Sequence, residues 1–308
     1  MIVYTVIVTY NGLKNDWIKK SLQSLSVSTQ KSNIVIVDNN SSDGTVQHIV
    51  NNFPAVFIIQ NIKNKGFGKA NNQGISHALN HNADYVFLLN QDAYVLKDTL
   101  TKLVAVAELN KDFGIISPIH LDGAGANVEN DFLNFASPPN TKNLTNDAFL
   151  NKVENKLYRT NFVNAAAWLV SKDCFRIVGG FSPTFYHYGE DNNYCHRAQF
   201  HNVSIGIYPH AFVLHDRDQM PAEHADLSER IFKDQLVGWA NPNSIAYNSP
   251  STQRLFLSYC FNLLQVKKKN VSKASKKLLY YRLFQFKQFK TILEATKSAT
   301  PFNFLDYQ

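Results

Sequence analysis

The chain of 308 residues is long enough for one large domain or two domains of ordinary size. A hydrophobic content of 44%, with 13% aromatic residues, excludes general disorder, and 13 glycines and 10 prolines are too few for a fibrous protein. The three cysteines cannot build a disulfide framework and form no C-x-x-C pair, which favours a reducing compartment. No signal peptide and no apolar run of about 18 residues is visible, so we expect a cytoplasmic protein that does not span a membrane.

The net charge of +7 is concentrated near the C-terminus. Ten lysines and arginines and a single acid, Glu294, lie between Val266 and Ser298, which leaves the rest of the chain close to neutral. This distribution argues against a nucleic-acid-binding body and predicts an anionic partner for the tail.

Short apolar runs alternate with longer mixed segments over the first 120 residues. The runs expected to be buried strands are Tyr4–Thr9, Asn33–Val37, Ala55–Ile59, Tyr85–Leu89 and Gly114–Ser117. The segments expected to be helices are Asp16–Ser26, Thr45–Asn52, Lys69–Asn80 and Lys97–Leu109. This alternation predicts an α/β fold with a mostly parallel sheet flanked by helices.

The second half of the chain is less regular. Leu121–Leu157 is polar and rich in turn residues, so we expect an inserted loop there. Asn161–Ser171 and Val203–Tyr208 are expected to be strands, Glu190–His201 a helix, and the chain after about Pro221 helical to its end.

Polar residues follow each strand of the first half, and in a parallel sheet such strand ends converge on one ligand site. The chain has no P-loop and no complete dinucleotide-binding glycine pattern, which argues against a dehydrogenase. Asp38, at a strand end, can accept hydrogen bonds from a base or ribose, although a capping role is the alternative. The glycine-rich segment Asn64–Asn71 precedes a helix whose N–H groups could face a diphosphate, with an ordinary turn as the alternative.

Four further residues could carry chemistry. Asp92 can hold a divalent cation if a diphosphate completes the shell, or it caps a turn. Asp191, next to Glu190 at a helix start, can act as a general base, or both acids simply favour the positive helix end. His215 follows a strand, where a lone histidine is more often structural than a ligand.

Five motifs follow one another along the chain: VTYNG (Val8–Gly12), VDNNSSDGT (Val37–Thr45), NKGFGKANNQGI (Asn64–Ile75), LLNQDA (Leu88–Ala93) and GGFSPTFYHYGEDNNYCHRA (Gly179–Ala198). In this order the chain, from Met1 to about Arg217, resembles family 2 glycosyltransferases of the GT-A fold. The likeness is greatest to bacterial rhamnosyltransferase-like members, which take part in cell-surface polysaccharide biosynthesis.

The resemblance implies a role for each matching position. Nucleotide-sugar binding is implied for Thr9, Tyr10, Asn11, Asp38, Asn64, Lys65, Gly66, Asn71, Asn90 and Gln91. Asn90 replaces the first acid of the D-x-D motif, so Asp92 is left to hold Mg²⁺ or Mn²⁺, with His215 near the metal and diphosphate. Asp191 is implied to be the catalytic base. Trp168, Tyr186, Tyr188 and Glu190 are expected on the acceptor side, with burial in the core as the alternative for the aromatic rings.

These roles imply an inverting transfer of a hexosyl or deoxyhexosyl group from a nucleoside-diphosphate sugar to a saccharide or lipid-linked saccharide. A sugar-phosphate nucleotidyltransferase and a non-catalytic nucleotide-sugar-binding protein on the same fold are the alternatives.

The tail is expected to be a separate unit. We assign residues 1–220 to the catalytic domain and 221–308 to a helical, basic extension. Leu279, Leu283, Phe286 and Leu293 are spaced as one face of a helix, which predicts a basic amphipathic helix at an anionic inner-membrane surface. The alternative is packing on the catalytic domain or on a second subunit of a homo-oligomer.

Overall fold

The computed structural model describes residues 1–217, 226–244, 251–263, 269–298 and 300–308. The expected domain boundary after residue 220, and Lys267 and Lys268 of the basic tail, lie outside these residues.

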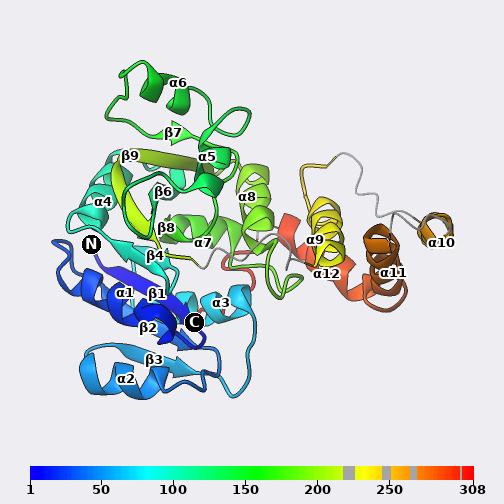
Figure 1. Ribbon diagram of the computed structural model, residues 1–308, viewed down its shortest axis with the longest axis horizontal. Helices are drawn as coiled ribbons and strands as arrows, with labels where there is room; N and C mark the ends of the chain where they lie inside the picture. The colour runs from blue at the N-terminus through cyan, green and yellow to red at the C-terminus, as the bar shows by residue number, and fades with distance from the viewer. Residues whose placement is uncertain (218–225, 245–250, 264–268, 299) are drawn as a thin grey trace.

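The main body is a curled mixed sheet of nine strands in the order β3-β2-β1-β4-β8-β6-β9-β5, with β7 paired to β9 (Figure 1). The strands are β1 (Val3–Thr9), β2 (Asn33–Asp38), β3 (Phe57–Gln60), β4 (Tyr85–Leu89), β5 (Ala93–Val95), β6 (Phe113–Asp122), β7 (Tyr158–Arg159), β8 (Ala167–Ser171) and β9 (Ser204–His215). Strands β1 to β4 are parallel, as expected, whereas β8 runs antiparallel to both β4 and β6.

Helices cover both faces of this sheet (Figure 1). They are α1 (Trp17–Ser26), preceded by a 3₁₀ turn (Lys14–Asp16), α2 (Thr45–Asn52), α3 (Phe67–Asn80), α4 (Thr99–Leu109), α5 (Asn130–Ala136), α6 (Leu144–Phe149), α7 (Lys172–Val178) and α8 (Glu190–Phe200). Side chains alternate across a strand, so Val6 faces the core with α3, α7 and α8, and Ile7 faces the core with α1, α2 and α4. This two-sided burial explains the continuously apolar strands.

Several segments differ from the expectations. The chain is not helical to its end, because residues 300–308 form turns and coil. The segment Leu121–Leu157 contains α5 and α6 as well as loops. Only the last five residues of Asn161–Ser171 form a strand, β8. Strand β9 continues seven residues beyond Tyr208, because it pairs with β6 and with the short strand β5, and it therefore ends at His215.

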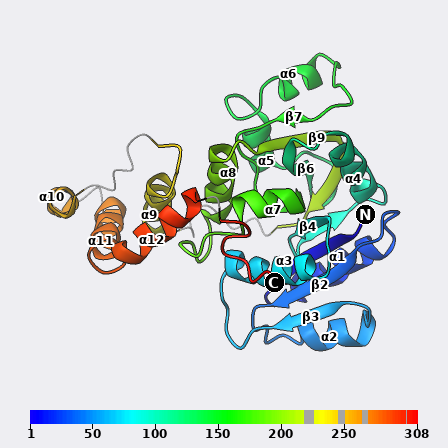
Figure 2. The same cartoon turned by 180° about the vertical axis from the view of Figure 1, so that it is seen from behind.

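The C-terminal helices are α9 (Leu227–Trp239), α10 (Thr252–Leu263), α11 (Lys269–Phe284) and α12 (Phe286–Lys297), and they project from one side of the body (Figure 1). Leu236, Trp239, Leu278, Phe289 and Leu293 build a small core of their own around Phe185 of the main body. The last residues return to the body beside α3 (Figure 2). There the Gly180 N–H donates to Asn303 O (2.7 Å) and the Asp306 N–H to Ser76 Oγ (2.9 Å).

The prediction of a single amphipathic helix near the C-terminus is wrong. The helix stops at Phe284 and a new one starts at Phe286, so the four apolar residues do not share one face. Leu293 is 7% exposed in the small core, whereas Leu283 is 56% exposed. None of the helices in the described ranges combines the length and the apolar character needed to cross a membrane.

Candidate active site

The polar ends of β1 to β4 meet at one edge of the sheet, as the sequence predicts. The Asn39 N–H donates to Thr9 O (2.8 Å), and the Asn61 N–H donates to Asp38 O (2.9 Å). The Thr9 hydroxyl donates to Gln91 Oε1 (2.7 Å), which joins the end of β1 to the residues after β4.

Asp38 is buried at the end of β2 with one carboxylate oxygen satisfied and the other not. Its Oδ2 accepts the backbone N–H groups of Asn40 (3.1 Å) and Ser41 (3.0 Å). Its Oδ1 has no hydrogen-bond partner within the described residues. A buried acceptor without a partner is costly, so this atom is suited to a donor from a bound ligand.

Tyr10 and Asn11 follow β1 beside Asp38. Tyr10 is 50% exposed, and its backbone N–H donates to Gln91 Oε1 (3.0 Å). Asn11 adopts a left-handed conformation (φ 50°), and its Oδ1 accepts the Ser42 N–H (2.9 Å). Gln91 and Asn11 therefore hold the loops of the site together.

Gly66 brings the start of α3 against the loop that leads to α8. Its φ of +82° suits glycine, and a Cβ there would lie 2.0 Å from the backbone oxygen of Tyr186. That oxygen accepts the Phe67 N–H (3.2 Å), so this N–H of the helix start is not free for a diphosphate. Asn64 and Asn71 also make local bonds, since Asn64 Oδ1 accepts the Gly66 N–H and Asn71 donates to Phe67 O. Lys65 is partly exposed beside them.

Asp92 and His215 are brought together by the pairing of β5 with β9. Ala93 is the register partner of His215, and Asp92 O accepts the Asp216 N–H (2.8 Å). His215 Nε2 consequently lies 3.6 Å from Asp92 Oδ1. Asn90 Oδ1, at the preceding D-x-D position, is buried and lacks a partner within the described chain.

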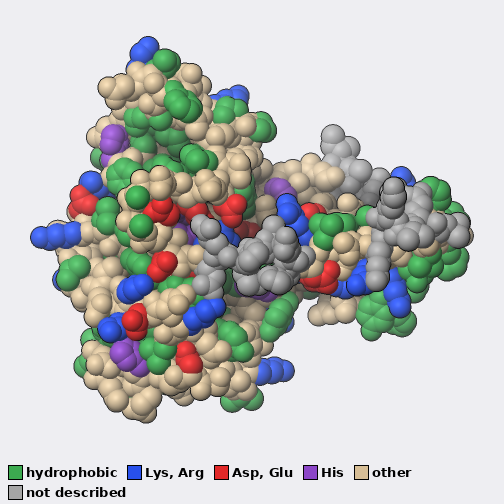
Figure 3. Space-filling model, in the orientation of Figure 1, with side chains coloured by type: hydrophobic (Ala, Val, Ile, Leu, Met, Phe, Trp, Pro, Cys, Tyr) green, Lys and Arg blue, Asp and Glu red, His purple; other side chains and the backbone are tan. Residues whose placement is uncertain are grey.

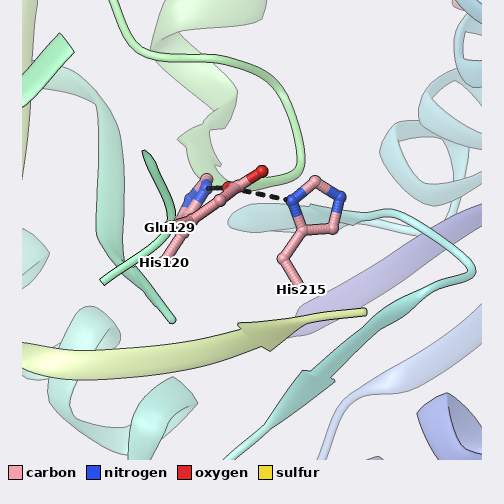
Figure 4. A group of neighbouring side chains, drawn as sticks. All are labelled: His120, Glu129 and His215. Atoms are coloured by element: carbon pink, nitrogen blue, oxygen red, sulfur yellow. Dashed lines mark hydrogen bonds and ion pairs between the residues drawn. The ribbon is translucent and has the colours of Figure 1, made fainter. Parts of the chain in front are cut away.

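Glu129 lies between His215 and a second buried histidine, His120 (Figure 4). Its Oε2 is 3.1 Å from His215 Nδ1 and 3.8 Å from His120 Nδ1, and its Oε1 accepts from Arg217 (3.1 Å). Burial lowers the pKa of His215, but Asp92 and Glu129 outweigh it and raise the value to about 9. Burial, together with His215, lowers the pKa of His120 to about 3, so that His120 is neutral.

Two groups of potential metal ligands meet at His215, on opposite sides of its imidazole. Ligand atoms of His120, Glu129 and His215 lie within 4.8 Å of one another, and Asp92 lies on the other side, beside Nε2. Because His215 Nδ1 faces Glu129, its Nε2 is the atom available beside Asp92. His120 and Glu129 were not singled out from the sequence, because one lies in an apolar strand and the other in an expected loop.

Glu190 and Asp191 begin α8 after Gly189, whose φ is +96°. Asp191 is partly exposed; burial raises its pKa, while hydrogen bonds from the backbone of Asn192, Asp191 itself and Ala165 oppose this. Glu190 is 5% exposed, and burial, followed by the charge of Asp191, raises its pKa to about 7. The two neighbouring acids therefore have different environments, which is typical of catalytic carboxylates.

The three expected acceptor-side aromatic residues separate into two groups. Trp168 has no exposed surface and packs against Phe181 and Tyr194, so its assignment to the acceptor side is corrected to the core. Tyr186 and Tyr188 are 62% and 60% exposed in the loop before α8.

Comparison with known proteins gives one family. The model of the family described as "Glycosyl transferase family 2" matches residues 4–163. Among curated proteins, the low-salt glycan biosynthesis hexosyltransferase Agl10 of Haloferax volcanii is 26% identical over 175 residues, which are 56% of this chain and 55% of that protein. The dTDP-rhamnosyl transferase RfbF of Shigella flexneri is 25% identical over 217 residues, 69% of this chain and 68% of that protein. The chain thus matches about half of the length of the first relative.

A solved structure of S. aureus TarS, residues 1–349 in complex with UDP, superposes with a TM-score of 0.55. The match covers 96% of this chain and 91% of that chain at 16% identity, so it bears on the fold alone. It agrees with the expected GT-A fold.

Proposed function

The chain belongs to glycosyl transferase family 2 and is rhamnosyltransferase-like, and we propose that it transfers a hexosyl or deoxyhexosyl group with inversion. The donor is a nucleoside-diphosphate sugar, and the acceptor is a hydroxyl of a saccharide or lipid-linked saccharide. The activities named for the two relatives make dTDP-rhamnose and nucleotide-activated hexoses the first donors to test.

One connection carries this proposal. The Ala165 backbone lies close enough to Asp191 to lower the pKa of that carboxyl, and the next residue, Ala166, accepts the Asn90 N–H (2.9 Å). Two adjacent residues before β8 therefore link the expected base to the loop that holds Asp92. Such a link supports one site in which a base and a diphosphate-binding group act on the same sugar.

Asp191 is proposed as the general base. It takes a proton from the acceptor hydroxyl as that oxygen attacks the anomeric carbon from the face opposite the leaving diphosphate. Burial raises the pKa of Asp191, which makes the carboxylate a stronger base than an exposed aspartate. A single displacement inverts the anomeric carbon and requires no covalent enzyme intermediate.

Asp92 and His215 are proposed to hold Mg²⁺ or Mn²⁺, with Asn90 beside them. A bound divalent cation offsets negative charge on the diphosphate leaving group. Asp38, Thr9, Tyr10 and Asn11 are proposed to receive the nucleoside; the unpaired Oδ1 of Asp38 supports this. Asn64, Lys65, Gly66, Asn71 and Gln91 are proposed to surround the diphosphate and sugar, and Glu190 to adjoin the acceptor.

The division of the chain is also a proposal: a GT-A catalytic domain at 1–220 and a helical extension at 221–308. On the extension, large apolar side chains of α10 and α11 are more than half exposed; this distal apolar patch consists of Phe256, Leu257, Phe261, Leu263, Leu283 and Phe284. Figure 3 shows hydrophobic side chains and basic residues gathered at this projecting end. Apolar side chains flanked by lysines match the interface of an anionic bilayer, so we propose peripheral attachment at the cytoplasmic membrane face.

The test is an assay of donor hydrolysis and transfer with candidate nucleotide-sugars, with Mn²⁺ and with excess EDTA. The proposal expects release of nucleoside diphosphate that depends on the metal, with the opposite anomeric configuration in the product. Nucleotide-sugar binding without any turnover would instead identify a non-catalytic binding protein, and pyrophosphate release from a nucleoside triphosphate and a sugar phosphate would identify a nucleotidyltransferase.

A further inference from the structure

A cavity of about 480 Å³ lies between residues 184–188, which lead to the acids of α8, and the facing sides of α9 and α11. Its volume is in the range of small-ligand sites. Phe185 forms part of its floor and belongs to the small core of the extension, so the cavity walls come from both parts of the chain.

The charged groups of this cavity are mostly lysines. Lys233, Lys276 and Lys277 line it, and Glu229 is the only acid among the described residues of its wall. Glu229 pairs with Lys277 and lies 3.7 Å from Lys233, while Lys276 is exposed and has no ion pair within the described residues. The lining therefore carries an excess of positive charge that matches a group of charge between −1 and −2, as on a phosphate.

Aromatic rings supply the other part of the lining. Tyr188 and Tyr280 are 60% and 58% exposed, and the ammonium of Lys233 lies 5.0 Å from the centre of the Tyr188 ring. Tyr188 has a φ of +66°, a conformation uncommon outside glycine that is found at ligand-binding sites when the surroundings enforce it. Exposed tyrosine rings beside an empty volume offer flat apolar faces of the kind on which sugar rings pack.

Residues of the cavity wall also contact both halves of the active site. Tyr186 lines it, accepts the Phe67 N–H at the start of α3, and donates from its hydroxyl to Asn64 O (3.3 Å) on the donor side. Lys233 is close enough to Glu190 to oppose the effect of burial on the pKa of that acid. A ligand in the cavity is therefore adjacent to the loop that leads to Asp191.

We propose that this cavity binds the acceptor, and that the acceptor carries a phosphate next to the sugar that receives the transferred group. The sugar packs on Tyr188 and Tyr280, and Lys276 and Lys277 pair with the phosphate. This inference rests on the proposed glycosyl transfer, because it identifies the second substrate of that reaction. The phosphate belongs either to a lipid carrier or to a soluble phosphorylated saccharide.

The test measures binding of three probes to the full chain by calorimetry, with the donor side saturated by nucleoside diphosphate and Mn²⁺. Dodecyl phosphate represents the lipid source, glucose 1-phosphate the soluble source, and octyl glucoside, below its micelle concentration, is the neutral control. We expect one phosphate probe to bind at least tenfold more tightly than octyl glucoside, and the tighter of the two identifies the source. Equal binding of all three probes would overturn the proposal.

Substitutions of lining residues test whether the phosphate probe binds in this cavity. K276A/K277A should weaken the phosphate probe about tenfold, and E229Q, which removes the competing acid, should strengthen it about threefold. K273A is the matched control, because Lys273 is an exposed lysine of the same helix that does not line the cavity. An equal loss in K273A, or no response to either cavity variant, would contradict the proposal. Donor hydrolysis by the wild-type chain is measured separately. Its absence would contradict the proposed function, whereas the binding of the three probes would still show whether the cavity takes a phosphate.

Discussion

The Glu129 carboxylate lies 3.1 Å from His215 Nδ1, on the side of the imidazole opposite Asp92. A carboxylate in this position holds the proton on Nδ1 and directs Nε2 toward the proposed metal position, an arrangement typical of metal-binding histidines. We therefore propose that Glu129, which the segment between β6 and β7 contributes to the site, is a positioning residue.

Replacement of Glu129 by glutamine should weaken metal binding. Glutamine keeps the shape of the side chain and loses the charge that holds the imidazole, so we expect about a tenfold loss of Mn²⁺ affinity in the presence of nucleoside diphosphate. Electron paramagnetic resonance of free Mn²⁺ measures this without any turnover. Asp131→Asn is the control, because Asp131 is exposed and, among the described residues, forms an ion pair with Arg217 alone. Unchanged Mn²⁺ affinity in E129Q, or an equal loss in the Asp131 variant, would show that Glu129 has no positioning role.

Replacement of Asp191 by asparagine should remove the base and keep the shape. We expect turnover to fall by about 10²-fold or more, with the affinity for nucleoside diphosphate unchanged. Steady-state transfer kinetics and nucleotide titration measure the two quantities. Glu190→Gln is the comparison and should cost less, since Glu190 is nearly enclosed and Asp191 is partly exposed. Turnover near the wild-type level in D191N would rule out this assignment.

The pKa of Glu190 makes stability depend on pH. In the folded chain this pKa is raised from 4.5 to about 7, so the native state binds the proton more tightly than the unfolded state does. The native state therefore loses stability as the pH rises from about 4.5 to 7. Glu190→Gln removes this loss, so its stability relative to the wild type should increase over that range by at most about 3 kcal/mol.

Urea denaturation at pH 4.5, 6 and 8 measures the effect. Glu294→Gln, at an exposed position in α12, provides the control and should follow the wild type at every pH. A constant difference between E190Q and the wild type across the three pH values would mean that Glu190 does not titrate in this range.

The parallel half of the sheet and its polar strand ends are predictable from sequence because they depend on local patterns. Apolar runs such as Tyr85–Leu89 identify buried strands, and polar residues directly after them mark the ligand edge. The group around Glu129 depends instead on long-range pairing. His215 reaches Asp92 only because β9 pairs with β5, and Glu129 is 86 residues away from His215 in the chain. No local pattern predicts the break at Gln285 either, because the helical spacing of apolar residues continues through it.

The distal apolar patch predicts binding to anionic membranes, and its removal should abolish that binding. L257S/F261S removes two side chains that are 67% and 60% exposed and outside the small core, so the fold should persist. In co-sedimentation with vesicles of phosphatidylcholine and phosphatidylglycerol, the wild type should pellet at low salt, and the variant should remain in the supernatant while still binding nucleoside diphosphate.

Phe149→Ser is the matched control, because Phe149 is 91% exposed on α6, in the main body. Point variants are preferable to a truncation, since the residues after 300 pack on α3 and α7. If the wild type ignores the vesicles and L257S/F261S changes its elution in size-exclusion chromatography, the patch joins two copies of the chain and does not bind a bilayer.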